Sequence, residues 1–403
     1  MEDIEYYQGD MGAHWRKSGA AARPQKNSQT GYLRQLAECL MGSGPMQRPA
    51  LARRIGLPRQ TVSDLLASLE SRGLVQVSGA LDGLPGRSQL SYALRANAAL
   101  ALGFDVGGTK LAGGLCDMRG TVLAEMTEPT DRGGAEGLVA QIAAMAENLC
   151  RKAGLPRFHV RNSAIGVPAA IDPQSGMPSL ADNLPGLDGA PLRDALATAL
   201  GGEVHLDNDV NLALLAETAR GAARGRNNVV FIALGTGIGG ALLVNDHLLR
   251  GAFGGAGEIG YMPCPGAEGT TTLEAQVGEA GIRRAYGAAG GDPGHTVRDI
   301  FAAAEAGNAA ASAALDGAAA HVAQALIAIL ALVDAEMVVF GGSIGARPEF
   351  IARVERRVAA GWIRPVVLQR SAAGGRAGLL GALETARQFM LEDLFGPAPS
   401  NQG

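Results

Sequence analysis

The chain has 403 residues, a formal net charge of −4 and few aromatic side chains. This length predicts two or three domains with a sizeable buried core, and the composition is typical of an α/β protein. The sequence shows no uninterrupted apolar run of membrane-spanning length and no secretion signal at its start. We therefore expect a cytoplasmic protein with no membrane partner.

Charge is unevenly distributed along the chain. Residues 1–95 carry 12 Lys/Arg against 8 Asp/Glu, whereas the remainder carries 23 against 31. Four of the early acids precede residue 14, so residues 14–95 hold 12 basic side chains against 4 acidic ones. A basic segment ahead of an acidic body predicts a polyanionic partner for that segment alone. The four cysteines show no C-x-x-C spacing, and we expect free thiols.

The N-terminal part reads as an arm followed by three helices. Residues 1–28 are polar without an apolar period, so we expect a flexible arm. Apolar side chains at 31–41 fall on one helical face before a Gly/Ser/Pro stop. Residues 48–58 predict a short helix ending in a tight turn at Gly56, and residues 59–73 predict a longer amphipathic helix.

The second and third of these helices fit a helix-turn-helix. Ala52 is small enough to let two helices touch, and Val62 and Leu65 anchor the second one. Residues 74–78 and 88–94 predict two strands around a Gly/Pro-rich loop, which completes a winged helix. A protein-interaction module is the alternative, but the basic surplus favours DNA. The residues expected to contact DNA are Arg53, Arg54 and Arg59 at phosphates, Gln60, Thr61 and Ser63 at base edges, and Arg87 at the wing tip.

The body begins near residue 97 with a predicted β-hairpin over 102–116. Its two extended runs join through Gly107-Gly108-Thr109, where glycine allows backbone conformations that a side chain forbids. The N–H groups of such a turn form a cradle for an anion such as phosphate, and Asp105 is placed to hold a metal ion or a water beside it. A turn with no ligand is the alternative.

Further polar and glycine-rich motifs follow along the body. Asn208-Asp209 belongs to a predicted strand at 204–211 and precedes a helix expected at 212–220, where α/β folds place chemistry. A second glycine hairpin covers 229–244, and a third glycine turn covers 338–343. Two glycine hairpins half a body apart predict a duplicated fold with two lobes facing one cleft. Other expected elements are a cleft-lining loop at 178–187, an apolar helix at 321–333 and a C-terminal helix at 378–395.

Five motifs occur in one order: Asp105–Lys110, Asn183–Gly186, Asn208-Asp209, Leu234–Gly240 and Gly255–Gly260. From about residue 97 onward the chain thereby resembles the ROK family (repressors, open reading frames and sugar kinases) of the actin-like ATPase superfamily. With a winged helix in front, it resembles the family's repressor branch, which includes xylose- and N-acetylglucosamine-responsive regulators.

The resemblance implies an α/β fold in which an N-terminal winged helix-turn-helix precedes a two-lobed actin-like ATPase (duplicated RNase H-like) sugar-kinase fold. The domains would be a flexible arm at 1–28, the winged helix-turn-helix at 29–96, a first lobe at 97–212 and a second lobe at 213–395. The C-terminal helix would pack back on the first lobe, and a tail would follow at 396–403.

The resemblance also implies roles for individual residues. Asp209 would take the proton from a sugar hydroxyl as it attacks the γ-phosphate of ATP. For each Asn or Glu, a turn-capping role is the alternative. The expected ATP-binding residues are Asp105, Gly107, Gly108, Thr109, Lys110, Gly235, Thr236 and Gly237 near the phosphates, and Gly341 and Gly342 near adenosine. The expected sugar-binding residues are Asn183, Asn208, Asp209, Glu258, Tyr261 and Glu274.

Two departures from the family pattern affect these expectations. The family has a His where this chain has Tyr261, and that His helps to bind sugar and a structural zinc. The family's cysteine cluster is reduced here to Cys264, with no His nearby in the sequence. We therefore expect no zinc and no metal-ligating residues. The same changes weaken the expectation of efficient phosphotransfer.

The sequence favours a sugar-responsive transcriptional regulator, a repressor of carbohydrate-utilisation genes, over two alternatives. The first alternative is an ATP-dependent hexose or N-acetylhexosamine kinase, glucokinase-like or bifunctional, and the second is a scaffold. Regulation would require no cofactor, whereas ATP with magnesium stays open. Expected partners are operator DNA, a small sugar or sugar phosphate, and further copies of the chain in a homodimer or tetramer.

Overall fold

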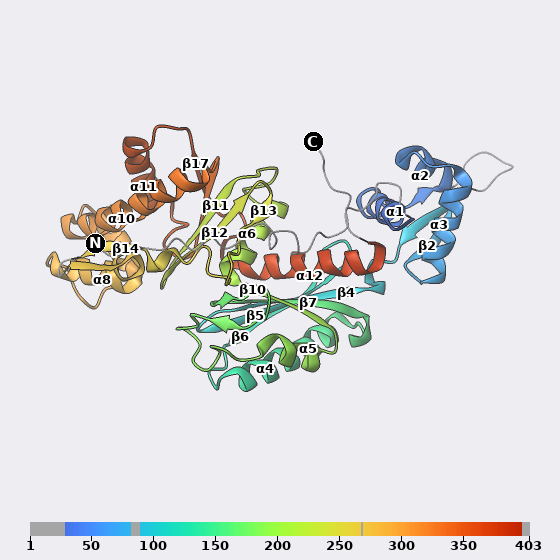
Figure 1. Cartoon of the computed structure of the whole chain (residues 1–403), viewed down its shortest axis with the longest axis horizontal. Helices are drawn as coiled ribbons and strands as arrows, with labels where there is room; N and C mark the ends of the chain where they lie inside the picture. The colour runs from blue at the N-terminus through green and yellow to red at the C-terminus, as the bar shows by residue number, and fades with distance from the viewer. Residues whose placement is uncertain (1–28, 82–88, 267–268, 397–403) are drawn as a thin grey trace, which may run out of the picture. The chain divides into compact units, whose positions relative to one another are not determined.

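The computed structural model describes residues 29–81, 89–266 and 269–396 (Figure 1). The chain divides into two compact units. One comprises Met1–Arg95 with Leu391–Gly403, and the other comprises Ala96–Met390. Each unit has its own core, and we describe them separately.

The first unit contains a helix-turn-helix with a three-stranded sheet. Its elements are α1 (Gln29–Ser43), β1 (Met46–Gln47), α2 (Arg48–Ile55), α3 (Arg59–Ser71), β2 (Val75–Leu81) and β3 (Gln89–Leu94). Helix α2 ends at Gly56, whose φ of 71° is the left-handed conformation that glycine adopts without strain. The predicted helix-turn-helix and the two wing strands are confirmed, whereas β1, which pairs with β3, was not expected.

The core of this unit explains why the three helices pack as they do. Leu40, Leu51, Val62 and Leu69 come from α1, α2 and α3 and are fully buried. Packing these side chains together removes their apolar area from water and so stabilises the unit.

The first lobe of the second unit is built on a five-stranded sheet with the order β10-β7-β4-β5-β6. Its antiparallel members are β4 (Leu100–Val106), β5 (Lys110–Asp117) and β6 (Val122–Pro129), and its parallel members are β7 (Val160–Val167) and β10 (Glu203–Asn208). Helices α4 (Ala135–Ala153) and α5 (Leu192–Leu200) cover one face of the sheet (Figure 1). A short ladder, β8 (Ala170–Ile171) with β9 (Pro178–Ser179), follows β7.

The second lobe repeats this arrangement. Its sheet has the order β13-β12-β11-β16-β17, with the first three strands antiparallel and the last two parallel. The strands are β11 (Val229–Leu234), β12 (Ile238–Val244), β13 (His247–Leu248), β16 (Met337–Gly341) and β17 (Val367–Arg370). Strand order and directions match the first sheet, so the predicted duplication is confirmed.

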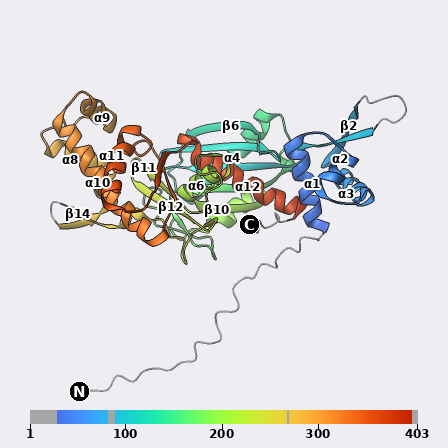
Figure 2. The ribbon, with the colours of Figure 1, turned by 90° about the horizontal axis from the view of Figure 1, so that it is seen from above.

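The second lobe also carries its own additions. A small hairpin pairs β14 (Pro263–Gly266) with β15 (Gly269–Thr272). The helices are α7 (Leu273–Val277), α8 (Glu279–Ala288), α9 (Val297–Glu305), α10 (Ala309–Val333) and α11 (Pro348–Gly361). Figure 2 shows α8, α9, α10 and α11 gathered on one side of this lobe.

Helix α10 is apolar along most of its length but is interrupted by Asp316, His321 and Gln324, so it does not contradict the expectation that no uninterrupted apolar run spans a membrane. Over the part of the chain that the structure describes, this one helix is long and apolar enough by length and composition to cross a membrane. Its Leu315, Val322, Leu326 and Leu330 are nevertheless buried in the core of the second lobe, beside strand β16. An all-round apolar helix is expected at such a buried position.

Two helices connect the lobes. They are α6 (Asp209–Arg220), which leads from β10 to β11, and α12 (Ala377–Phe395), which follows β17. A side chain on Gly103 of β4 would lie 2.5 Å from the backbone of Leu383, and one on Gly381 would lie 1.8 Å from the carbonyl oxygen of Leu212. Glycine at these two positions therefore lets α12 press against both the first sheet and α6.

Candidate functional site

The first glycine turn is closed by its own backbone. The N–H of Gly107 donates to the carbonyl of Lys110 at 2.8 Å, and the hydroxyl of Thr130 donates to the carbonyl of Gly107 at 2.7 Å. A Cβ on Gly108 would lie 3.5 Å from Cβ of Asn183, so the turn adjoins the predicted cleft loop. Thr109 and Lys110 are exposed. The N–H of Gly107 is engaged, so it does not point at a ligand in this conformation.

The second glycine turn is held by a side chain. The carboxylate of Glu274 accepts the N–H of Ile238 at 3.1 Å, and a Cβ on Gly237 would lie 2.1 Å from the same carboxylate. Gly235 donates its N–H to the carbonyl of Gly237 at 2.9 Å. Glu274 was expected to bind sugar, and here it also shapes the turn. Only glycine at position 237 leaves room for it.

The third glycine turn packs against the second. Gly342 has a φ of 81°, and a Cβ there would lie 2.2 Å from the carbonyl oxygen of Leu234. Both the left-handed backbone and the close approach require glycine at this position. A Cβ on Gly341 would meet the ring of Phe231 at 2.6 Å, which places Gly341 in the sheet rather than in the cleft.

Asp209 is the first residue of α6, so the helix begins three residues earlier than the sequence predicted. The reason is the cap. Asn208 adopts an extended backbone, and its side-chain oxygen accepts the N–H groups of Val210 at 2.9 Å and Asn211 at 3.3 Å. The side-chain amide of Asn208 also donates to the carbonyl of Ala169 at 3.2 Å. The capping role considered as an alternative for Asn208 is therefore present.

A partly buried network of side-chain hydrogen bonds fixes this capped loop. Asp207 accepts the side-chain amide of Asn211 at 2.8 Å, and two N–H groups of Arg250 donate to its other oxygen at 2.7 and 3.0 Å. Arg250 comes from the second lobe and Asp207 from the first. Because charge-assisted hydrogen bonds are the strong ones, this pair positions the start of α6 relative to both lobes. Sequence reasoning missed Arg250, since no motif marks it.

The electrostatics of the site are dominated by carboxylates. Burial raises the pKa of Asp209 to about 7, and the nearby charges of Asp105 and then Glu258 add to the effect against the lowering influence of the Val210 N–H. Burial also raises the pKa of Asp105, which Lys110 partly opposes. Like charges that share a dehydrated site disfavour the ionised form of one another.

A cleft of about 540 Å³ joins these features. All the residues expected to bind sugar line it, namely Asn183, Asn208, Asp209, Glu258, Tyr261 and Glu274. Among the residues expected to bind ATP, Gly235, Gly237 and Gly342 line it. The structure does not place Asp105, Gly107, Gly108, Thr109, Lys110, Thr236 or Gly341 on its wall.

The mouth of the cleft holds one acidic residue that was not singled out from the sequence. The hydroxyl of Tyr261 donates to the carboxylate of Asp182 at 3.0 Å, and Tyr261 is half exposed. Burial raises the pKa of Glu258, to which the charges of Glu274 and Asp182 contribute. Asp182 precedes Asn183 in the predicted cleft loop, and that adjacency was the available signal.

Cys264 corrects the expectation of a cysteine without a histidine. Its Sγ lies 3.1 Å from Nδ1 of His321, which reaches it from α10. Burial raises the pKa of the Cys264 thiol and lowers the pKa of the His321 imidazole, so burial favours the neutral form of each. Within the described residues, no group of three or more His, Cys, Asp or Glu side chains is arranged to hold a metal ion.

The helix-turn-helix exposes most of the predicted DNA-contacting side chains. Arg53, Arg54, Arg59 and Gln60 are exposed, and Thr61 and Ser63 are half-buried. Two of them have partners already, since Gln60 donates to Asp64 at 3.0 Å and Ser63 donates to the carbonyl of Arg59 at 3.0 Å. The predicted wing-tip residue, Arg87, lies outside the described residues.

Two lobes of identical strand order, with glycine turns and a carboxylate-rich cleft between them, define the actin-like class of sugar and nucleotide folds. The chain belongs to the ROK family, whose model matches residues 101–388, and an IclR helix-turn-helix domain matches residues 33–79. It thus has the architecture of a ROK repressor, with a helix-turn-helix ahead of a ROK body.

Relatives include both kinases and regulators. The structure is similar to a ROK family glucokinase from Streptomyces griseus in complex with glucose and AMPPNP, at 26% identity and a TM-score of 0.61 over 72% of this chain and all of that one. A ROK family transcriptional regulator, homologous to E. coli MLC, shares the fold over 91% of this chain and 98% of its own, at 19% identity and a TM-score of 0.74. The xylose repressor of Bacillus spizizenii is 25% identical over 224 residues, or 55% of this chain and 58% of the repressor.

Proposed function

We propose that the protein is a sugar-responsive DNA-binding transcriptional regulator, and that it represses carbohydrate-utilisation genes. The observation that carries the proposal is the fusion, in one chain, of a helix-turn-helix to a ROK body with a polar cleft. The repressor among its relatives supports the same assignment.

The DNA face would use two kinds of contact. Arg53, Arg54 and Arg59 would pair with phosphates, and Gln60, Thr61 and Ser63 at the start of α3 would reach base edges. Arg87 would contribute from the wing. The exposure of the arginines supports this assignment, because guanidinium groups that meet phosphates must be accessible.

The effector would be a small sugar or sugar phosphate in the cleft. Sugar hydroxyls are hydrogen-bond donors, and the cleft offers converging acceptors from Asn183, Asp209 and Glu258. Tyr261 and Glu274 would complete the site. Because the side-chain amide of Asn208 already caps α6, Asn208 would contribute only its remaining hydrogen-bonding capacity. The complex of the related glucokinase with glucose and AMPPNP supports a ligand of this size and chemistry.

We further propose that the chain works as a homodimer or tetramer, with a winged helix-turn-helix at 29–96 and lobes at 97–212 and 213–395. Sugar that closes the cleft would change the spacing of two winged helices. Half-sites one DNA turn apart tolerate little change in that spacing, so a modest lobe rotation would release the operator.

The test begins with operator fragments selected from the source genome by binding to the purified full-length protein. Affinity for the best fragment is then measured by fluorescence anisotropy at fixed salt, across hexoses, pentoses, N-acetyl sugars and their phosphates. We expect one sugar to change the affinity at least about tenfold, in line with typical allosteric coupling energies. An unchanged affinity across the whole panel would remove the sugar from the proposal.

Sugar kinase activity is the second candidate, and the pKa of Asp209 is the observation that favours it. A carboxylate with a pKa of about 7 is half deprotonated near neutral pH, which suits a general base for a sugar hydroxyl. Asp105 at the first turn fits a hydrated magnesium ion on ATP phosphates, which would neutralise their charge. Sugar-dependent ATP turnover that disappears in Asp209→Asn would establish a kinase fused to a DNA-binding domain.

A further inference from the structure

The chain passes between the lobes twice, and one buried carboxylate ties both passages together. The first passage consists of α6 and the residues after it, and it leads from β10 to β11. The second passage, residues 371–376, leads from β17 to α12. Glu217 of α6 is 0% exposed. It accepts the N–H of Ala222 at 2.7 Å in the first passage. In the second passage it accepts the hydroxyl of Ser371 at 2.5 Å and the N–H of Ala373 at 3.0 Å.

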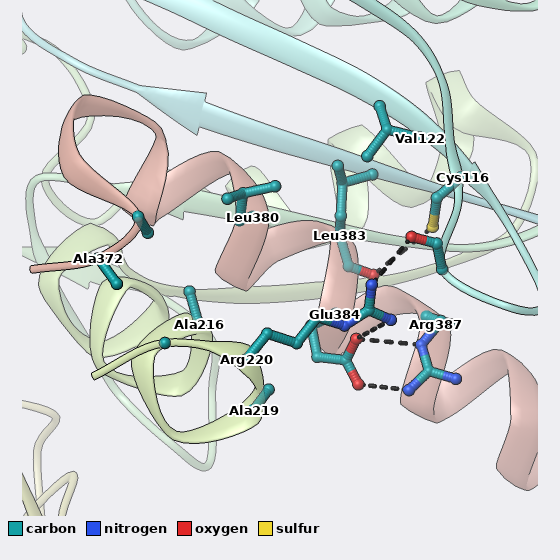
Figure 3. Close-up of a pocket in the computed structure, with 13 residues that line it drawn as sticks. Cys116, Val122, Ala216, Ala219, Arg220, Ala372, Leu380, Leu383, Glu384 and Arg387 are labelled. Atoms are coloured by element: carbon teal, nitrogen blue, oxygen red, sulfur yellow. Dashed lines mark hydrogen bonds and ion pairs between the residues drawn. The ribbon is translucent and has the colours of Figure 1, made fainter. Parts of the chain in front are cut away.

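A cavity of about 200 Å³ is lined by Ala216, which precedes Glu217, and by Ala372 and Ala373, which donate to Glu217, and we name it the hinge cavity (Figure 3). Ala216 and Ala219 of α6 line one side, and Ala372 and Ala373 of the second passage line another. These side chains are too short to fill the space. Both passages therefore contribute walls to the same cavity, so any change in the angle between the lobes alters its dimensions.

The remaining walls are mostly apolar. They come from Leu380 and Leu383 of α12, from Val122 of β6 and from Cys116 of β5. Burial raises the pKa of the Cys116 thiol to about 12, so this wall is uncharged near neutral pH. A dry apolar cavity of about 150 Å³ is large enough to admit benzene, and the hinge cavity is of that size class.

One edge of the cavity is charged. Glu384 accepts Nε of Arg387 at 3.0 Å, and Nη2 of Arg220 lies 3.4 Å from the same carboxylate oxygen (Figure 3). Two guanidinium groups thus share one carboxylate. Arg387 is largely buried in this pair, whereas the side chain of Arg220 is 57% exposed and also donates to the backbone carbonyls of Gly120 at 3.2 Å and Arg119 at 3.3 Å. Two guanidinium groups against one carboxylate leave this edge with a net positive charge, which favours a further anion.

We propose that the hinge cavity is a second ligand site, which binds a small aromatic monocarboxylate with its ring among the alanines and leucines and its carboxylate on Arg220. Apolar walls with one well-placed charged group are the usual composition of small-molecule pockets. Because both passages contact the ligand, it binds one lobe arrangement better than another. By linkage it shifts the population of lobe arrangements, whatever occupies the main cleft.

Binding is tested on the full chain with 4-fluorobenzoate followed by fluorine NMR. We expect saturable millimolar binding, as befits a ligand of this size. Ala219→Leu, which fills the cavity from α6, should weaken it at least about tenfold, and Ala372→Leu should do the same from the other passage. Thermal unfolding of each variant shows that loss of binding is not loss of fold, and two variants on separate elements guard against one failing to fold.

The charged edge is tested with Arg220→Met, which keeps the length of the side chain but not its charge. It should weaken 4-fluorobenzoate about tenfold and leave neutral fluorobenzene unchanged. Ala140→Leu, on half-buried α4 of the first lobe, is the control that should leave both probes unaffected. The site is overturned if 4-fluorobenzoate shows no saturable binding to the natural protein. It is also overturned if both cavity-filling variants bind 4-fluorobenzoate as tightly as the natural protein does.

The effect on the lobes is tested separately by amide hydrogen exchange. Saturating 4-fluorobenzoate should slow exchange several-fold at Ala222, Ala372 and Ala373 and leave α4 unchanged, because only the passages between the lobes are held. Binding without this protection would overturn the coupling to the hinge. Neither measurement requires a sugar or an operator, so both stand or fall independently of the proposed regulatory function.

Discussion

Helix α6 carries a buried carboxylate near each end, and the two are built in opposite ways. At its start, Asp209 accepts the N–H of Val210 and faces the charges of Asp105 and Glu258. Near its end, Glu217 collects donors from both passages between the lobes. Burial alone therefore does not identify chemistry. A buried carboxylate that accepts several hydrogen bonds has a structural role, whereas a carboxylate placed among like charges has a raised pKa and can exchange a proton.

The largest effect on stability is expected from removing the carboxylate of Glu217. Glu217→Ala leaves three N–H groups and a hydroxyl buried without their acceptor, and we expect it to destabilise the body by about 4 kcal/mol. Glu217→Gln should lose less, because its remaining oxygen still accepts. The midpoint of urea unfolding of the full chain measures both, with exposed Glu203→Ala as the control that should stay within about 0.5 kcal/mol. A loss from Glu217→Ala no larger than that of the control would remove the contrast between the two carboxylates.

The second effect concerns pH and arises at the other end of the helix. The pKa of Asp209 is raised in the folded state to about 7, from an ordinary value of 3.8. The folded form therefore binds this proton more tightly. The resulting stability is complete below about pH 4, declines as pH rises and is lost above about pH 7, to a total of about 4 kcal/mol at most.

Asp209→Asn keeps an oxygen for the Val210 N–H and removes this one titration, so the difference in stability between the natural protein and the variant should shift by up to about 4 kcal/mol between pH 4 and pH 8. Urea midpoints at a series of pH values test this. Asp172→Asn provides the control, because backbone N–H groups of Ser175 and then Gln174 lower the pKa of Asp172. Its contribution is present above its ordinary pKa and is lost only in more acidic solution. A stability difference between the natural protein and Asp209→Asn that is the same at pH 8 as at pH 4 would show that Asp209 is not held protonated.

These cases also show what the sequence could and could not predict. The duplicated lobes were predictable, because glycine turns and apolar strands are local patterns that recur. The place of Asp209 and Glu258 on the wall of the cleft was predictable from the resemblance between motifs. Glu217 was not, because three of its four hydrogen-bond partners lie 154 to 156 residues further along the chain, and nothing local marks a Glu in a helix as buried.

The start of α6 and the surroundings of Cys264 are two further features that the sequence analysis did not predict. Asn208 has the side chain of a helix cap, so an earlier helix start was available from local chemistry and was missed. His321 is distant from Cys264 in the sequence but close to it in the fold. Packing of α10 brings it to 3.1 Å, a contact that no spacing rule could predict.

A third prediction contrasts the DNA face with the body. Arg59→Ala should weaken operator binding about tenfold and reduce the salt slope by about one, because a phosphate contact releases a counterion. Arg132→Ala, which removes an exposed arginine of the first lobe, should change neither quantity. Anisotropy titrations over a range of salt concentrations provide both numbers. Equal effects from the two variants would mean that binding follows overall charge rather than the helix-turn-helix.

The smallest effect is expected at the mouth of the cleft. Tyr261→Phe removes the hydroxyl that donates to Asp182 at 3.0 Å, in a half-exposed setting where such a bond contributes less than about 1 kcal/mol to stability. The pKa of Tyr261 is raised, first by this hydrogen bond, so the hydroxyl is a neutral donor throughout the physiological range. If Tyr261 meets the sugar, its loss should weaken sugar binding about three- to tenfold with little change in unfolding, as calorimetry with the sugar identified in the panel would show. Because Phe keeps the ring, unchanged affinity for the sugar would mean that Tyr261 either stacks on the sugar or only holds Asp182. Tyr261→Ala, which removes the ring, would then separate those two roles.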